Sequence, residues 1–423
     1  MLDRTIPPVF HTIQVPTLLE PEQQTLANGV KQFVFDYGDQ DLLRIQWVFP
    51  HVDFNPEKAV RQSMLAGLIL EGTRTYTNKE IAEKVDFYGA FLQPEFNADQ
   101  FTLTLFSLQK HVQELLPLIL SILQESVFPE KECATYRRNT RQHLLISLEK
   151  GDYLAKRAFD HALYGDSIYG YTVKPEDFDT VTTPDLLDLY HKQIRPDNCI
   201  MFVAGKCSSD ILSSLQHVFG TQWQIRDAAP VNPGFIPEMH PTDIIHIPRK
   251  QALQAAIRIG QRSISRTHSD FPRLQLLNSV LGGYFGSRLM RNIREDKGYT
   301  YGIGSGLISG NKAAYFTIAT EVGVAHQQAT LEEIEKELKL LQEYPLEDAE
   351  LNLVKNYMLG AFVGSLENVF SHADKFKQAY LSHLDNQYYT YYMQQIQNAQ
   401  AADLQTLALK YLDYTQMVKV VVA

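Results

Sequence analysis

The sequence predicts an α+β protein built from two similar halves. Helical patterns and strand candidates are interspersed along the 423 residues, and several strand candidates alternate apolar with polar side chains. That alternation favours antiparallel or mixed sheets covered by helices on one face. The chain is too long for one ordinary domain, and an apolar content of 44% is sufficient for two hydrophobic cores.

The order of elements repeats along the chain. Each half has a strand candidate rich in branched and aromatic residues, then a helix candidate, then a near-continuous apolar strand. These segments are 42–49, 61–70 and 199–204 in the first half, and 253–260, 273–281 and 417–423 in the second. The spacing between equivalent segments is roughly 210 residues, which indicates duplication and fusion of one domain plan.

A proline-rich segment separates the two halves. Residues 227–241 read DAAPVNPGFIPEMHP, with four prolines in fifteen residues. Proline interrupts both helices and central strands, so this segment is the predicted linker. The predicted domains are therefore 1–226 and 242–423.

Longer helices are expected inside both halves. Residues 111–124 repeat apolar side chains at spacings of three and four, and Pro129 is placed to begin a polar helix that continues to about residue 150. Residues 331–341 and 348–360 follow the same pattern in the second half. Residues 91–106 alternate apolar and polar side chains, which is typical of strands.

Composition excludes several classes of function. The net charge of −10 argues against nucleic acid as a partner, since phosphate binding needs a basic face, and no apolar run approaches the length of a membrane helix. The N-terminal residues lack the pattern of a secretory leader. Cys133, Cys199 and Cys207 are odd in number and have no C-x-x-C spacing, which favours a reducing compartment. We expect a cytoplasmic protein with no nucleic-acid or membrane partner.

The segment 61–90, RQSMLAGLILEGTRTYTNKEIAEKVDFYGA, resembles the pitrilysin (insulinase) family of zinc peptidases, which includes the processing peptidases. The similarity continues through 128–130 and 163–166, and in the second half through 281–283 and 294–301. It therefore extends over nearly the whole chain. The resemblance implies two homologous domains, each with a mostly antiparallel sheet covered by helices, which together form half of a clamshell chamber.

In active members of this family the first helix carries H-x-x-E-H. The resemblance places the two histidines at Ser63 and Gly67, the general base at Ala66, and the distal glutamate ligand at His143. A supporting glutamate of the family falls on Tyr136. Three protein ligands and a base are needed for zinc hydrolysis, and these positions do not supply them. We expect no cofactor in this chain, with zinc only in a partner subunit.

The second half retains a different pair. In the family, an arginine and a tyrosine seven residues apart hold the substrate beside the zinc, and Arg294 and Tyr301 have this spacing. The resemblance implies that the arginine opens a loop and the tyrosine lies on the next strand. Both side chains donate hydrogen bonds suited to a peptide carbonyl. The alternative is that Arg294 pairs with Glu295 or Asp296 and that Tyr301 packs.

The segment 91–106 has a further implied role. In the family an edge strand here accepts the substrate as an added strand through main-chain hydrogen bonds, and these do not depend on zinc. Pro94 is compatible with an edge strand. An ordinary sheet strand explains the same residues.

These features give two main hypotheses. In the first, the chain is a catalytically silent subunit that binds peptides or unfolded polypeptide and supplies Arg294 and Tyr301 to a zinc-bearing paralogous subunit. It could also form a homodimer in isolation. In the second, it is a non-enzymatic scaffold or peptide-binding protein. An independent zinc peptidase with other ligands is a third hypothesis.

Overall fold

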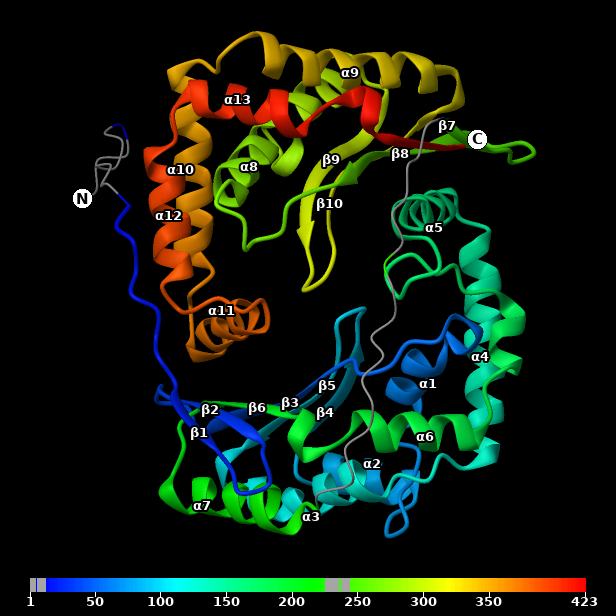
Figure 1. The fold of residues 1–423 in the computed structure, drawn as a ribbon, viewed down its shortest axis with the longest axis vertical. Helices are drawn as coiled ribbons and strands as arrows, with labels where there is room; N and C mark the ends of the chain where they lie inside the picture. The colour runs from blue at the N-terminus through cyan, green and yellow to red at the C-terminus, as the bar shows by residue number, and fades with distance from the viewer. Residues whose placement is uncertain (1–4, 6–12, 225–235, 237–243) are drawn as a thin grey trace.

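The structure is a computed structural model that describes residue 5 and residues 13–224, 236 and 244–423 (Figure 1). The predicted linker 227–241 lies outside the described residues, except for Ile236. Two β-sheets lie at opposite ends of the view, and helices cover them.

The first sheet has the strand order β1-β2-β6-β3-β5-β4, and the second has the order β7-β11-β8-β10-β9. The strands of the first sheet are β1 (Glu22–Thr25), β2 (Lys31–Asp36), β3 (Leu42–Pro50), β4 (Phe91–Phe96), β5 (Gln100–Leu108) and β6 (Ile200–Gly205). Those of the second are β7 (Ile244–Ile247), β8 (Gln254–Arg262), β9 (Thr300–Ser309), β10 (Ala314–Gly323) and β11 (Val418–Val422).

The two sheets share one topology. The pairs β2/β6 and β7/β11 are parallel, and the other pairings are antiparallel. In order of pairing, β7-β11-β8-β10-β9 therefore repeats β2-β6-β3-β5-β4. The predicted α+β class is confirmed, and the repeat seen in the sequence corresponds to a repeated fold.

Helices of the first half are α1 (Arg61–Leu68), α2 (Asn78–Phe87), α3 (Gln109–Glu125), α4 (Glu130–Leu148), α5 (Gly151–Tyr164), α6 (Thr183–Gln193) and α7 (Ser209–His217). Those of the second are α8 (Phe271–Asn278), α9 (Gln327–Glu343), α10 (Asp348–Gly364), α11 (Val369–Leu381), α12 (Tyr388–Asn398) and α13 (Ala401–Tyr411). Two π-helical segments, Ser279–Gly283 and Met290–Asp296, follow α8. Pro129 is the residue before α4 and not its first helical residue.

Each sheet is buried on both faces. Along β3, Leu43, Ile45 and Trp47 enter the large core that the first-half helices complete. Arg44 and Gln46 point to the opposite face, where they contact α11. This follows from the two-residue period of a strand. Our expectation of helices on one face only was therefore wrong.

The second cover of each sheet comes from the other half of the chain. Helix α11 packs its aromatic residues against Phe33 and Phe202 of the first sheet. Helix α5 packs Phe159 and its neighbours against Val418 and Val420 of the second sheet. The two halves thus exchange equivalent helices across their interface (Figure 1). Burial on both faces explains why β6 and β11 are almost continuously apolar.

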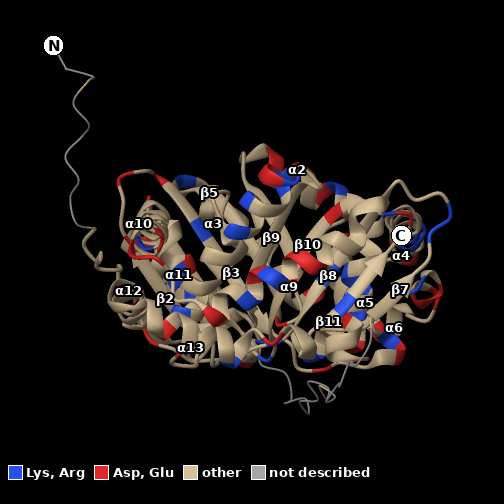
Figure 2. Ribbon diagram, turned by 90° about the horizontal axis from the view of Figure 1, so that it is seen from above, with Lys and Arg blue, Asp and Glu red and all other residues tan. Residues whose placement is uncertain are grey.

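Charges of both signs are interspersed over the ribbon, without a large face of one sign (Figure 2). Within the described residues, none of the helices combines the length and the apolar content that crossing a bilayer requires.

Candidate functional site

Helix α1 carries the three positions where the family places its zinc ligands and base. The Ser63 hydroxyl is already engaged, because its Oγ donates a hydrogen bond to the Val60 carbonyl at 2.9 Å. Ala66 is buried in the core, and Gly67 is exposed. None of these residues offers a group that binds a metal strongly or accepts a proton from water.

A ring from α4 occupies the space beside these positions. The Tyr136 hydroxyl donates a hydrogen bond to the Ser63 carbonyl at 3.1 Å. A Cβ atom at Gly67 would overlap this ring, lying 2.6 Å from its Cζ atom. Burial raises the pKa of the Tyr136 phenol above its usual value, so the hydroxyl donor persists further into the alkaline range. The second histidine position, Gly67, therefore lacks a ligand side chain, and the Tyr136 ring blocks the space that one would need.

His143 does not complete a metal site. It is exposed and lies seven residues after Tyr136 on the same helix. No group of three or more His, Cys, Asp or Glu side chains in the described part of the chain could hold a metal ion. The residues at the family's zinc position do not fit zinc, and we derive no chemistry through a metal in this chain.

The overlap at Gly67 gives a direct stability prediction. We expect Gly67→Ala to lower the free energy of unfolding by about 1–2 kcal/mol, since the Tyr136 ring must move and its hydrogen bond is lost. In a Tyr136→Ala background the same change should be neutral or stabilising, because alanine favours the helix by up to about 1 kcal/mol over glycine. Urea unfolding of the four proteins of this double-mutant cycle measures the coupling. Equal effects of Gly67→Ala in both backgrounds would contradict the overlap.

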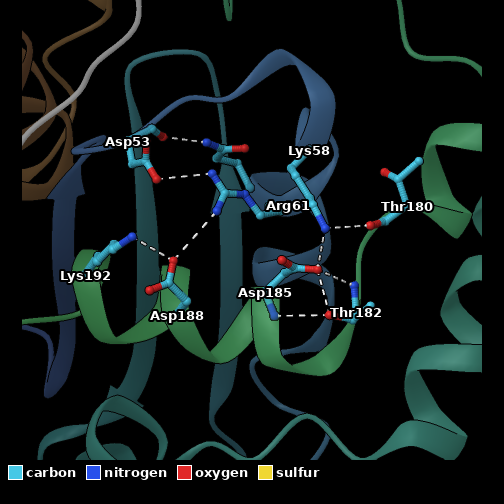
Figure 3. A network of polar contacts seen from close by, with 9 residues as sticks. Asp53, Lys58, Arg61, Thr180, Thr182, Asp185, Asp188 and Lys192 are labelled. Carbon is cyan, nitrogen blue, oxygen red and sulfur yellow. Dashed lines mark hydrogen bonds and ion pairs between the residues drawn. The ribbon is translucent and has the colours of Figure 1, made fainter.

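A polar network fixes the N-terminal end of α1 (Figure 3). The buried Arg61 guanidinium contacts Asp53 at 3.1 Å and Asp188 of α6 at 3.9 Å. Gln62 donates to the Asp53 carbonyl at 2.7 Å, and Lys192 pairs with Asp188 at 2.7 Å. These contacts hold α1 against α6, so the scaffold of the zinc helix is preserved although its ligands are not.

Lys58 makes a second connection to α6. Its ammonium donates to the Asp185 carboxylate at 2.7 Å and to the Thr180 carbonyl at 2.9 Å. Asp185 also receives hydrogen bonds from the Thr182 hydroxyl and backbone N–H in the capping box of α6. Burial alone would raise the pKa of Asp185, but these hydrogen bonds outweigh it and hold the pKa at about 2.

The contribution of Asp185 to the free energy of unfolding should therefore depend on pH in the acid range. Its folded-state pKa lies below the unfolded value of about 3.9, so its stabilisation is complete above that value and is lost as pH falls towards 2. We expect Asp185→Asn to cost about 1–2 kcal/mol at pH 7, with the cost shrinking between pH 4 and 2. Unfolding free energies of both proteins from pH 7 to 2 test this. Asp179→Asn, which removes an exposed ion pair to Arg141, is the control. A cost that stays constant down to pH 2 would refute the assignment.

The retained pair lies in the second half. Arg294 is inside the π-helical segment Met290–Asp296, so our expectation that it opens a loop was wrong. Tyr301 is on β9 as predicted, and its side chain is 92% exposed. Within the described residues, Arg294 forms no ion pair with Glu295 or Asp296. Tyr301 does not pack in a core. Both donors are available to a ligand.

The contact that Arg294 does make involves Phe285, which the sequence analysis did not single out. The guanidinium carbon lies 4.7 Å from the centre of the Phe285 ring, and this ring is itself 64% exposed. A cation above an aromatic face is attracted by the ring and keeps its N–H donors free. Phe285 therefore holds Arg294 without using up its hydrogen bonds. The signal in the sequence was an aromatic residue inside the glycine-rich run GGYFG.

The chain before Phe285 is held by close packing. A Cβ atom at Gly282 would lie 2.6 Å from the Ser305 Oγ atom, so the π-helical segment Ser279–Gly283 approaches β9 closely. The ring of Tyr284 contacts that of Tyr357 of α10 at a tilt, with ring centres 4.8 Å apart. Phe285, which contacts Arg294, directly follows Tyr284 in the chain.

The predicted edge segment 91–106 forms two strands, of which β4 is at the edge of the sheet and β5 is inside it. β4 pairs only with β5 in the described sheet, and it lies beside α1. Phe91 is 72% exposed, and Pro94 removes one main-chain donor from the strand. The strand therefore has unpaired main-chain groups and an exposed aromatic residue, which suit an added strand.

Comparisons with known proteins agree with this fold. The family profile described as the peptidase M16 inactive domain matches residues 180–358. The chain is 26% identical over 310 residues to the "Uncharacterized zinc protease YmxG" of Bacillus subtilis. The aligned region covers 73% of this chain and 74% of that protein. It is 27% identical over 204 residues to the "Probable inactive metalloprotease YmfF" of the same species, covering 46% of each.

A crystal structure of a peptidase M16 inactive domain from Pseudomonas fluorescens superposes with a TM-score of 0.85 at 19% identity, covering 96% of this chain and 98% of that one. At this identity the match establishes the fold. The sequence of the present chain contains no H-x-x-E-H. The resemblance to the pitrilysin type that its motifs predicted is therefore confirmed, and residues 180–358 match the M16 inactive domain.

Proposed function

We propose that this chain is the catalytically silent subunit of a two-chain zinc peptidase, in which it binds polypeptide and supplies Arg294 and Tyr301 to a zinc-bearing paralogue. The observation that carries the proposal is the contrast between the two sites. The Tyr136 ring lies against the second histidine position on α1, whereas Arg294 is half-buried, Tyr301 is exposed, and both keep their donors free.

The proposed chemistry of this chain is limited to binding and polarisation. Arg294 offers several N–H donors in a fixed plane, and Tyr301 offers one hydroxyl donor. Directed at a peptide carbonyl oxygen, these donors stabilise the negative charge that develops there during hydrolysis. Zinc in the partner would supply the activated water.

The edge strand β4 supports the polypeptide-binding part of the proposal. Its exposed backbone can add a substrate strand, and Phe91 offers an apolar surface to a side chain of that strand. This binding needs no metal, so it would persist in a subunit that has lost catalysis.

The test is a reconstitution. The chain alone, the zinc-bearing paralogue of the same organism alone, and their equimolar mixture are assayed with a quenched fluorescent peptide. We expect hydrolysis only by the mixture, and stoichiometric zinc only in the paralogue. Hydrolysis by the isolated chain with bound zinc would overturn the proposal. Full activity of the paralogue alone would instead favour the non-enzymatic scaffold or peptide-binding protein.

A further inference from the structure

A second candidate ligand site lies between the two halves. A pocket of about 780 Å³ is bounded by β1 and β2, the ends of β3 and β6, the β4–β5 and β9–β10 turns, and the end of α11. This volume is in the range that holds small organic ligands, and domain interfaces are common places for such sites.

The inner wall of the pocket is apolar. It comes from both halves and consists of Ile168, Ile200, Phe376, Tyr380, Leu381 and Leu384. His383 adopts a left-handed backbone conformation with φ of 60° at the end of α11, and this turns the chain so that Leu384 faces the pocket. A ligand that enters would bury apolar surface here.

The acidic groups of the pocket are already hydrogen-bonded within the protein. Asp99 accepts a hydrogen bond from the Tyr169 hydroxyl and another from the Asn311 N–H at 3.1 Å. Asp385 accepts from the Gln387 N–H at 3.0 Å. Asp99 thereby joins the β4–β5 turn of one half to the β9–β10 turn of the other.

The lysines of the pocket lack partners of the kind that its acidic groups have. Lys31 and Lys312 line the pocket from opposite halves and are exposed, and neither ammonium has an ion-pair partner among the described residues. Burial lowers the pKa of His51, which keeps its ring neutral at neutral pH. The pocket therefore offers two ammonium groups without ion-pair partners beside an apolar wall, while Asp99 and Asp385 keep their charge and are hydrogen-bonded to neutral donors. An anionic group on a ligand would give the two ammonium groups the partner they lack.

The pocket is remote from Arg294 and Tyr301. Lys312 lies eleven residues after Tyr301, in the turn that follows the far end of β9, and a strand rises about 3.3 Å per residue. The separation is on the order of 30 Å. A ligand here would leave the proposed polarising pair free.

We propose that this pocket binds a carboxylate attached to an apolar group, with the carboxylate between Lys31 and Lys312 and the apolar group against the inner wall. Such a carboxylate can belong to a small fatty acid or to the C-terminus of a polypeptide that ends in an apolar residue. The site is independent of the proposed peptidase function.

The first test uses octanoate as the probe, with octan-1-ol as the neutral counterpart, in titration calorimetry on the full chain. We expect octanoate to bind at least tenfold more tightly than octan-1-ol. The double change Lys31→Ala and Lys312→Ala should weaken octanoate at least tenfold and leave octan-1-ol unchanged. Lys206→Ala, which removes an exposed lysine paired with Asp41, is the matched control.

A second variant tests the apolar wall. Ile168→Trp fills the pocket and should abolish binding of both probes, while its circular dichroism spectrum reports whether the fold is kept. The lysine variants alter only exposed side chains, so they remain informative if Ile168→Trp does not fold.

The source of the carboxylate is distinguished by competition. The tetrapeptide Ala-Ala-Phe-Leu is added as a free acid or as a C-terminal amide. Displacement of octanoate by the acid and not by the amide identifies a polypeptide C-terminus, and absence of displacement identifies a small carboxylic acid. The proposal is overturned if octanoate does not bind, if octan-1-ol binds equally well, or if the double lysine variant binds octanoate as the wild type does.

Discussion

Changing Arg294→Lys or Tyr301→Phe should lower the peptide hydrolysis rate of the reconstituted pair by about 100-fold each, because loss of one donor to a developing oxyanion typically costs that much. Lysine keeps the charge of Arg294 but loses its planar set of donors. Phenylalanine keeps the ring of Tyr301 and removes the hydroxyl. The loss should fall mainly on kcat, since the donors act on the reacting carbonyl.

The chain offers matched controls for both changes. Arg291→Lys alters an exposed arginine in the same π-helical segment, and Tyr344→Phe alters a tyrosine that is 61% exposed on another surface. Both controls should keep the wild-type rate. Phe285→Ala should lower the rate by a smaller factor, since it removes the ring that supports Arg294 and no donor. If Arg294→Lys and Tyr301→Phe behave like the controls, this chain supplies no polarising group to its partner.

The largest stability loss is expected from Asp374→Ala. The Asp374 carboxylate on α11 pairs with Arg44 at 2.8 Å and with Lys377 at 3.0 Å. Burial alone would raise the pKa of Asp374, but these two cations outweigh it and lower the pKa. Removing the carboxylate leaves two largely buried cations without their counter-charge. Because the Asp374 side chain is itself 47% exposed, we expect a cost of about 2–3 kcal/mol in the free energy of unfolding, below that of most fully buried pairs.

Urea unfolding measures this cost, and amide hydrogen exchange shows which helices are destabilised. Protection should fall in α11, where the anchor to the first sheet is lost, and less in α5. Asp41→Ala is the control, because Asp41 and Lys206 form an exposed pair at 3.5 Å whose loss should cost under about 1 kcal/mol. A cost for Asp374→Ala no larger than that of the control would show that the buried cations are satisfied by other groups.

Local patterns predicted most elements of the fold. The strand at 42–49 and the helix at 61–70 match β3 and α1 to within two residues, because branched and aromatic residues indicate the strand and apolar spacing indicates the helix. The helix candidate 273–281 was less accurate. α8 ends at Asn278 and the chain continues as a π-helical segment, a change of winding that apolar spacing does not encode.

The partner of a helix could not be predicted in the same way. The apolar face of α11 is visible in the sequence, but nothing local indicates that it packs on the sheet of the other half. Likewise, the sequence showed that Ser63, Ala66 and Gly67 replace the zinc chemistry. It could not show that Tyr136 fills the adjoining space, since that contact joins residues 73 positions apart in the chain.

The exchange of α5 and α11 determines which parts of this protein can move. Neither sheet keeps its inner cover if the halves separate, since Phe202 loses α11 and Val420 loses α5. Hinge motion between the halves would therefore expose two apolar faces to water. The free-energy cost would be comparable to that of local unfolding. We expect each chain to behave as a single rigid shell. An entrance that admits a polypeptide would then open at the seam between two chains, and the dissociation rate of the pair would set how often it does so.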